Sequence, residues 1–220
     1  TSEIKSRSLK ALFDKEVNER APRDNFFHCL VNAAHQFHRR ENNDDRYIIA
    51  GYPWFKCRAR DTFISLPGLT LSIEEDDYFE LVMKGYYEFM EGKPITVHIA
   101  EIEQPDVPLW AVWALQQYAK EKGKEACLKK YGKFIKDVVM YVKCNHHPNL
   151  KLMPNGLLYT DGKDKAVTWM NSTANGHPVV PRTGYIVEFN ALWYNALCFC
   201  ASLCELAGKE KDQQQFLEAA

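Results

Sequence analysis

Two large aromatic side chains, Tyr52 and Trp54, flank the turn-forming Pro53, and a charged pair, Arg60 and Asp61, follows a few residues later. Aromatic rings cover the C–H faces of a sugar, while an arginine donates hydrogen bonds to its hydroxyl groups and an aspartate accepts them. The same residue types would equally form an aromatic core cluster with a structural salt bridge. The stretch therefore indicates either a site for a neutral polyol such as a sugar or a packed aromatic cluster.

Further polar residues stand where predicted helices begin, beside long loops. They are Asp106 ahead of Trp110, Trp169 and Asn171 in the longest loop, Arg182 near the end of that loop, and Glu188 and Asn190 at the head of the most apolar helix. Asp106 has the alternative of a simple N-cap, and Arg182 that of a surface residue. Glu188 is harder to set aside, because an acid at the head of an otherwise buried helix costs free energy unless it is paired or functional. Carboxylates beside tryptophans indicate glycoside chemistry, in which an acid protonates the leaving oxygen and a base activates water.

Apolar residues recur at helical spacing along most of the chain, which predicts an all-α fold. Helices are expected at 24–37, 62–69, 72–90, 106–118, 124–142, 188–206 and 209–220, and short strands at 47–50, 95–99 and 156–160. Short polar turns alternate with long loops, as a ring of helical hairpins requires, with the functional loops at one rim. The helix at 124–142 has a single apolar stripe, as an outer helix would, whereas the helix at 188–206 is apolar on most faces, as an inner helix would be. The pattern therefore predicts an α/α toroid.

Residues 1–220 are expected to form one incomplete domain, the N-terminal part of such a toroid. The chain starts without Met and stops inside a predicted helix, which indicates a piece of a longer protein. No linker-like composition divides it. A part of a ring would expose the inner faces of its first and last hairpins, so the piece alone is expected to be poorly stable.

Composition narrows the possible partners and the compartment. The formal net charge is −1, so no basic field attracts nucleic acid or an anionic membrane. The start of the chain is polar and the most apolar stretch, 185–206, is interrupted by acids and amides, so neither a signal peptide nor a membrane span is expected. Seven cysteines without a disulfide-type spacing predict reduced, mostly buried thiols and a cytoplasmic protein. Cys198 and Cys200 point to different faces of a helix, so no metal site is expected from them and Cys204.

Six short motifs follow one another along the chain. They are AGYPWF (50–55), RDT (60–62), LPGL (66–69), DVPLW (106–110), TWM (168–170) and VEFNALWY (187–194). Together they resemble the C-terminal amylo-α-1,6-glucosidase domain of glycogen debranching enzymes, and the similarity extends from about residue 26 to residue 206. Other barrel glucosidases, such as glucoamylases and trehalases, are the chief competitors, and the last motif favours the debranching kind.

The resemblance implies an (α/α)6 barrel and an inverting hydrolysis of the α-1,6-linked glucose at branch points of glycogen or limit dextrin, without metal or organic cofactor. It implies that Arg60 and Asp61 hold the glucose, with the rings of Trp54 and Trp110 as walls. Asp106 and Glu188 are expected to line the same pocket. Trp169, Arg182 and Asn190 are further candidate substrate-binding residues, next to the candidate catalytic positions Asn171 and Glu188.

The chain departs from the family's pattern in two respects. Asn171 stands where the motif Thr-Trp-Met-Asp carries the expected general acid, and an amide can form hydrogen bonds but cannot deliver a proton. Loss of proton donation commonly costs ~10²–10⁴-fold in rate. The family's catalytic base is expected downstream of this chain, and the two groups of an inverting pair must face each other across the sugar at roughly 6.5–9.5 Å.

Three interpretations stay open. The first is a debranching-type glucosidase whose acid is substituted or relocated, for example to Glu188, Asp61 or Asp164. The second is a glucan-binding relative that kept the pocket but lost the acid at Asn171. The third is a helical interaction module without a sugar site, which the order of the motifs disfavours.

Overall fold

The computed structural model describes residues 8–40, 45–52, 54–94 and 98–220. The chain divides into two compact units, Thr1–His38 and Arg39–Ala220. Helices make up 57% of the structure, which confirms the predicted all-α class. No helix among the described residues is long and apolar enough to cross a membrane.

Among its described residues, 8–38, the first unit contains two helices, α1 (Leu9–Glu19) and α2 (Phe26–His35). Each begins at a capping side chain: Ser8 accepts a hydrogen bond from a backbone N–H of α1, and Asn25 does so for α2. Helix α2 confirms the helix predicted at 24–37. Helix α1 was not predicted, and it buries none of its residues.

The second unit holds the remaining helices. They are α3 (Ala59–Leu69), the short 3₁₀ helix η2 (Leu71–Ile73), α4 (Asp76–Met90), α5 (Val107–Lys122), α6 (Lys124–Lys143), α7 (Val187–Leu206) and α8 (Glu210–Ala219). Each overlaps a helix that the sequence predicts. The helix expected at 72–90 is interrupted because Glu74 has a left-handed φ of 64°, and α4 begins only at Asp76. Helix α3 begins three residues earlier than predicted, so Arg60 and Asp61 lie in its first turn rather than ahead of it.

Short strands position the start of α3 and of α5. The strands are β1 (His38–Arg40), β2 (Arg46–Gly51), β3 (Phe55–Arg58) and β4 (Ile99–Ala100) in one sheet, in that order, and the two pairs β5 (Lys151–Leu152) with β6 (Leu158–Tyr159) and β7 (Thr173–Ala174) with β8 (His177–Pro178). Strands β2 and β6 confirm two predicted strands. Of the strand predicted at 95–99, residues 95–97 lie outside the described residues. Strand β3 pairs in parallel with β4, with Cys57 opposite Ile99. This pairing brings the beginning of α3 next to the loop that leads into α5.

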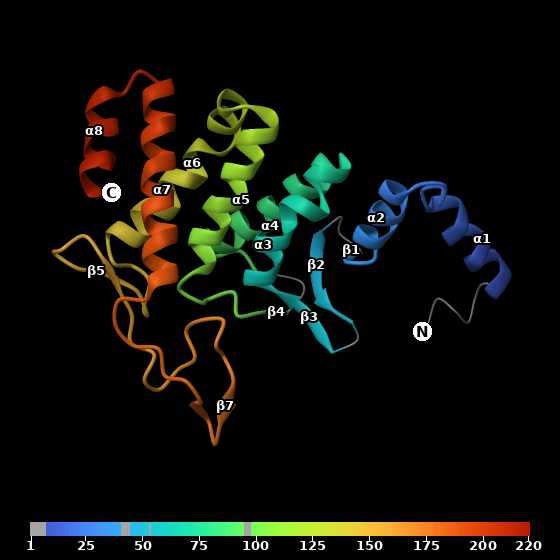
Figure 1. The fold of residues 1–220 in the computed structure, drawn as a ribbon, viewed down its shortest axis with the longest axis horizontal. Coiled ribbons are helices and arrows are strands. Elements are labelled where there is room, and N and C mark those ends of the chain that lie inside the picture. Colours follow the sequence, from blue (N-terminus) through green and yellow to red (C-terminus); the bar gives the residue numbers. More distant parts are fainter. Residues whose placement is uncertain (1–7, 41–44, 53, 95–97) are drawn as a thin grey trace. The chain divides into compact units, whose positions relative to one another are not determined.

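The helices of the second unit pack on one another around an aromatic core. Helix α3 packs on α5, α5 on α6 and α7, and α7 on α8 (Figure 1). Ring contacts join α3 to α4 through Phe63 and Tyr86, with centroids 4.7 Å apart, and α5 to α6 through Tyr118 and Tyr131, at 5.2 Å. Helices α5 and α7 are buried along most of their length, as expected for inner helices. The closed ring of hairpins stays a prediction.

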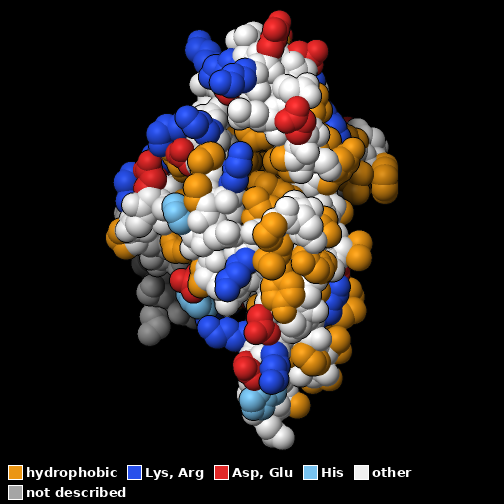
Figure 2. Space-filling view, turned by 90° about the vertical axis from the view of Figure 1, so that its left-hand side faces the viewer, with side chains coloured by type: hydrophobic (Ala, Val, Ile, Leu, Met, Phe, Trp, Pro, Cys, Tyr) orange, Lys and Arg blue, Asp and Glu red, His pale blue; other side chains and the backbone are white. Residues whose placement is uncertain are grey.

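One face of α7 remains exposed. Val187, Ala191 and Tyr194 recur at helical spacing and face solvent. Figure 2 looks at the side on which α8 and α7 lie in Figure 1, and it shows hydrophobic side chains gathered between charged groups. Val187 and Tyr194 are among the exposed large hydrophobic side chains of the described residues.

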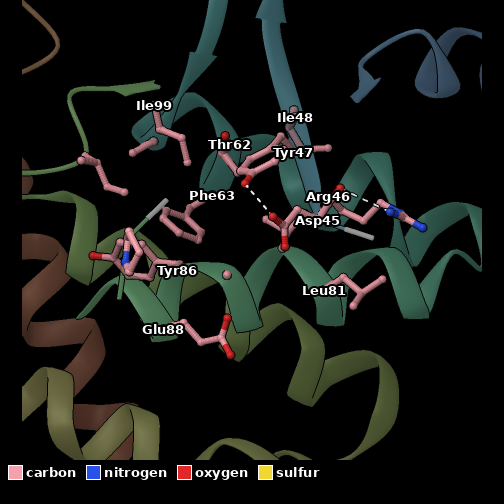
Figure 3. A pocket seen from close by; sticks show the side chains of 15 residues that line it. Asp45, Arg46, Tyr47, Ile48, Thr62, Phe63, Leu81, Tyr86, Glu88 and Ile99 are labelled. Atoms are coloured by element: carbon pink, nitrogen blue, oxygen red, sulfur yellow. Dashed lines mark hydrogen bonds between the residues drawn. The ribbon is translucent and has the colours of Figure 1, made fainter. Parts of the chain in front are cut away.

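A small cavity lies between β2, α3 and α4. Its volume is about 60 Å³, and the rings of Tyr47, Phe63 and Tyr86 are among the side chains that line it (Figure 3). Complete burial raises the pKa of the Tyr86 hydroxyl, so this phenol stays neutral. The cavity is too small for a sugar ring and belongs to the core.

The seven cysteines are all free thiols. Three are buried, two are exposed and two are intermediate, so the prediction that most are buried is wrong. Cys200 is buried, whereas Cys198, two positions before it on α7, faces in a different direction and is partly accessible. Cys204 is also partly accessible. Within the described ranges, no group of three or more His, Cys, Asp or Glu side chains could hold a metal ion.

Candidate active site

Arg60, in the first turn of α3, is the centre of a buried ionic network. Its Nε and Nη2 donate to the two carboxylate oxygens of Asp106 at 2.6 and 2.9 Å. Its Nη1 donates to Glu101 Oε2 at 3.2 Å, and Nη2 also donates to Gln104 Oε1 at 3.0 Å. Four of the five N–H groups of the guanidinium are therefore engaged. Burial alone would lower the pKa of Arg60, but the hydrogen bonds and charges of the carboxylates outweigh it and raise the pKa.

The partner of Arg60 is Asp106 rather than its sequence neighbour Asp61. Successive residues of a helix point about 100° apart, so the two side chains do not form one bidentate unit. The expectation that both residues hold the glucose stays a prediction. Asp61 is exposed, and its carboxylate has no hydrogen-bonding partner among the described residues. Asp106, expected to bind sugar hydroxyls, instead is 4% exposed and uses both oxygens on Arg60. Asp106 does occupy the N-cap position of α5, as the alternative interpretation expected, but its side chain makes no capping hydrogen bond.

Glu101 joins this network to the position of the expected general acid. Its Oε1 accepts from Arg58 Nη1 at 2.7 Å and from Asn171 Nδ2 at 2.5 Å, while Oε2 faces Arg60. Its backbone has a left-handed φ of 62°, which is uncommon for a residue other than glycine. Sequence reasoning missed Glu101. The available signal was an acid in the long loop just ahead of Asp106.

The longest loop is tied to this network at two points and closed at its neck. Gln104, which accepts from Arg60, donates through Nε2 to the carbonyl oxygen of Ala166 at 2.7 Å. Asn171 provides the second tie through Glu101. At the neck, the backbones of Thr160 and Gly184 exchange two hydrogen bonds at 3.1 and 2.9 Å. The loop therefore holds its polar side chains against the starts of α3 and α5.

Glu188, in the first turn of α7, is held as a carboxylate by its neighbours. Arg182 donates to both of its oxygens, at 2.9 and 2.8 Å, and the indole Nε1 of Trp169 donates to Oε1 at 2.9 Å. Partial burial would raise the pKa of Glu188, but the hydrogen bonds, chiefly from Arg182, outweigh it and lower the pKa. An ionised carboxylate cannot act as a proton donor at neutral pH. The contacts argue against Glu188 as the relocated acid, and they hold the 57% exposed ring of Trp169 in place.

The other predicted substrate-binding residues differ in how far they are accessible. Asn190 uses its amide on the backbone: it accepts from Leu158 N–H at 2.8 Å and donates to the carbonyl oxygens of Leu158 and Ile186. It therefore fixes β6 against α7. Trp110 is half-buried in an edge-to-face contact with Trp113. Trp54, at the turn between β2 and β3, is 82% exposed.

A polar cavity of about 720 Å³ opens beside Glu101. Its polar lining residues are His98, Glu101, Glu103, Gln104, Asn149 and Lys165. The volume lies in the range of ligand pockets in proteins, of roughly 300–1,000 Å³. The wall is reinforced by buried His147, whose Nε2 donates to the carbonyl oxygen of Glu103 at 3.1 Å and whose Nδ1 accepts from Asn149 N–H at 3.0 Å. Burial lowers the pKa of His147, so this imidazole is neutral.

Fold and site together define a helical domain whose polar site forms where three packed helices begin. Arg60 and Asp61 lie at the start of α3, Asp106 at the start of α5 and Glu188 at the start of α7. Residues 31–220 match the family model described as amylo-alpha-1,6-glucosidase, so the chain belongs to this family. It is accordingly a glycosidase domain related to glycogen debranching. A search of the curated proteins found no match.

Proposed function

We propose that this chain binds the glucose at the branch stub of an α-glucan, as part of an enzyme that hydrolyses the α-1,6 bond with inversion. The observation that carries the proposal is the network around Arg60, in which the start of α3, the loop before α5 and the longest loop are joined by ionic hydrogen bonds. Such a network fixes the side chains next to it in one geometry, which sugar recognition requires. Branched glucans such as glycogen or limit dextrin are the proposed substrates.

In this proposal, Asp61 is the residue of the Arg60–Asp61 motif that contacts sugar. Its carboxylate is exposed, whereas the guanidinium of Arg60 is almost saturated by protein acceptors. Carboxylate oxygens accept hydrogen bonds from sugar hydroxyls. The Arg60–Asp106 ion pair then holds the first turn of α3, and with it Asp61, in a fixed position. The exposed ring of Trp169 would pack against the C–H face of the sugar.

A binding protein with little hydrolytic activity is the second candidate, and the state of two side chains favours it. Asn171 donates an amide hydrogen to Glu101 and has no acidic proton to transfer. Glu188 is held ionised by Arg182. Under the first candidate, the proton must therefore come from another carboxyl group, and Asp61 and Asp164 remain from the sequence analysis.

Glucose release from a branched limit dextrin by the full-length protein separates the two candidates. Release at an ordinary enzymatic rate by the wild type supports the hydrolase and excludes Asn171 as an obstacle. Release only by Asn171→Asp supports the binding protein. Absence of release by both, together with absence of dextrin binding, would refute the proposal.

The assignment of Asp61 has its own test. Asp61→Ala should weaken binding of maltose or dextrin at least tenfold without loss of the fold. Asp212→Ala is a matched control, because Asp212 is also an exposed acid in the first turn of a helix, α8, away from the network. Equal affinities of the two variants would contradict the role of Asp61.

A further inference from the structure

Glu101 has a strained backbone and a crowded carboxylate. A non-glycine residue in the left-handed region costs of order 1–3 kcal/mol and persists where the surrounding structure requires it. Here Arg58, Arg60 and Asn171 all donate to the side chain, which is 15% exposed. Arg58 and Arg60 therefore donate to both oxygens of this carboxylate. Position 101 therefore presents a fixed negative charge to the side chain at position 171.

We propose that Glu101 is the positioning residue for position 171 and that its carboxylate requires a hydrogen-bond donor there. In this chain the donor is the amide of Asn171, whose nitrogen lies 2.5 Å from Glu101 Oε1. With the amide nitrogen directed at Glu101, the carbonyl oxygen of the same amide points elsewhere. Glu101 thus selects the orientation of Asn171. The positioning role of Glu101 is independent of the proposed function, whereas its consequence for proton donation rests on it.

The same geometry determines what an aspartate would do at this position. An oxygen in place of Nδ2 would lie close to Glu101 Oε1, and two carboxylates at this separation cannot both ionise at neutral pH. One proton would lie between them. Because arginine N–H groups already donate to both oxygens of Glu101, that proton would belong to the carboxyl group that Asn171→Asp introduces. A carboxyl that keeps its proton near neutrality is what a general acid requires. Glu101 would therefore turn an aspartate at position 171 into a proton donor.

The thermal midpoint of the full-length protein, followed from pH 4.5 to pH 8, tests this coupling without any activity. In Asn171→Asp, the folded state holds a proton that the unfolded state releases near pH 4. The stability from this proton is present at low pH and is lost as pH rises through the folded-state pKa. The deficit in midpoint relative to wild type should therefore grow with pH, by about 3–5 °C for each tenfold difference in proton affinity.

Two further variants serve as controls. Asn175→Asp makes the same exchange at the exposed turn between β7 and β8, where Asn175 has a left-handed backbone. The deficit in thermal midpoint of this variant should not change with pH. Glu101→Gln combined with Asn171→Asp should lose the pH dependence. Equal pH profiles of Asn171→Asp and Asn175→Asp would overturn the proposal, and this comparison holds even if the Glu101 variant does not fold.

Glucose release distinguishes a failure of this inference from a failure of the proposed function. If Asn171→Asp releases glucose, the alkaline limb of its pH–rate profile should move to lower pH when Glu101→Gln is added. If no variant releases glucose but the midpoints follow the expected pattern, the positioning role of Glu101 stands and the hydrolytic proposal fails. Glucose release by Asn171→Asp with a pH–rate profile that Glu101→Gln leaves unchanged would overturn the inference alone.

Discussion

Asp106→Asn should remove most of the stabilisation that the buried Arg60–Asp106 pair provides. The amide keeps one acceptor oxygen and directs its N–H group at the guanidinium, so at least one of the two hydrogen bonds, at 2.6 and 2.9 Å, is lost. A hydrogen bond to a charged group contributes about 1.5–3 kcal/mol, and removal of one partner of a buried pair costs about 3–5 kcal/mol. Glu101 stays within 3.2 Å of Arg60 as a second counter-charge. We therefore expect a loss near the lower end of the second range, about 3 kcal/mol.

Urea unfolding followed by circular dichroism measures this loss. Glu88→Gln is the control, since it removes the charge of an exposed ion pair, with Lys93 at 3.2 Å, and should cost less than about 1 kcal/mol. A double variant, Arg60→Met with Asp106→Leu, should lose less than Asp106→Asn alone, because no buried charge is left unpaired. If Asp106→Asn lost less than about 1 kcal/mol of unfolding free energy, as the control should, the Arg60–Asp106 pair would not be the desolvated ion pair inferred here.

Three further predictions concern the loops and thiols. Gly162→Ala should destabilise the long loop, because the new Cβ would lie 2.2 Å from the backbone carbonyl oxygen of Arg182. Limited proteolysis should then be faster. Gly85→Ala, at an open position of α4, is the control and should leave the rate of proteolysis unchanged or lower. Burial lowers the pKa of His147, so the stability that the neutral imidazole contributes should be complete above about pH 6.5 and decline as pH falls below that value. His147→Gln should therefore flatten the pH dependence of the thermal midpoint between about pH 5 and 7. Burial raises the pKa of the Cys127 thiol to about 12, so iodoacetamide should label it far more slowly than exposed Cys144, and equal labelling rates in the folded protein would contradict the buried position.

Local patterns in the sequence are sufficient to predict every described helix of this protein except α1. Each predicted helix corresponds to an observed one, because an amphipathic helix is specified by the spacing of apolar residues over a few turns. Breaks within the helical stretches were less visible: the interruption at Glu74 depends on the left-handed conformation of a single residue. Helix α1 was missed although Leu9, Leu12, Phe13 and Val17 recur at helical spacing along it; this apolar stripe is not buried in the structure.

The sequence also identifies the family and most segments of the candidate site, since the motifs lie next to the starts of α3, α5 and α7. It does not identify the partners within that site. Arg60 and Asp61 are adjacent in one motif, whereas the structure pairs Arg60 with Asp106, 46 residues away. Adjacent residues of a helix diverge, while the parallel pairing of β3 with β4 brings the start of α3 to the loop before α5.

Only the tertiary structure decided which acids are available for chemistry. From the sequence, Glu188 and Asp61 were candidates for the general acid, and Asp106 was expected to bind sugar hydroxyls. In the fold, Asp106 is buried on Arg60. Glu188 is held ionised by Arg182, whereas Asp61 faces solvent. Glu101, which no motif contains, lies against Asn171. The state of a carboxyl group depends on the charges and donors within a few ångströms, and long-range packing brings those groups together.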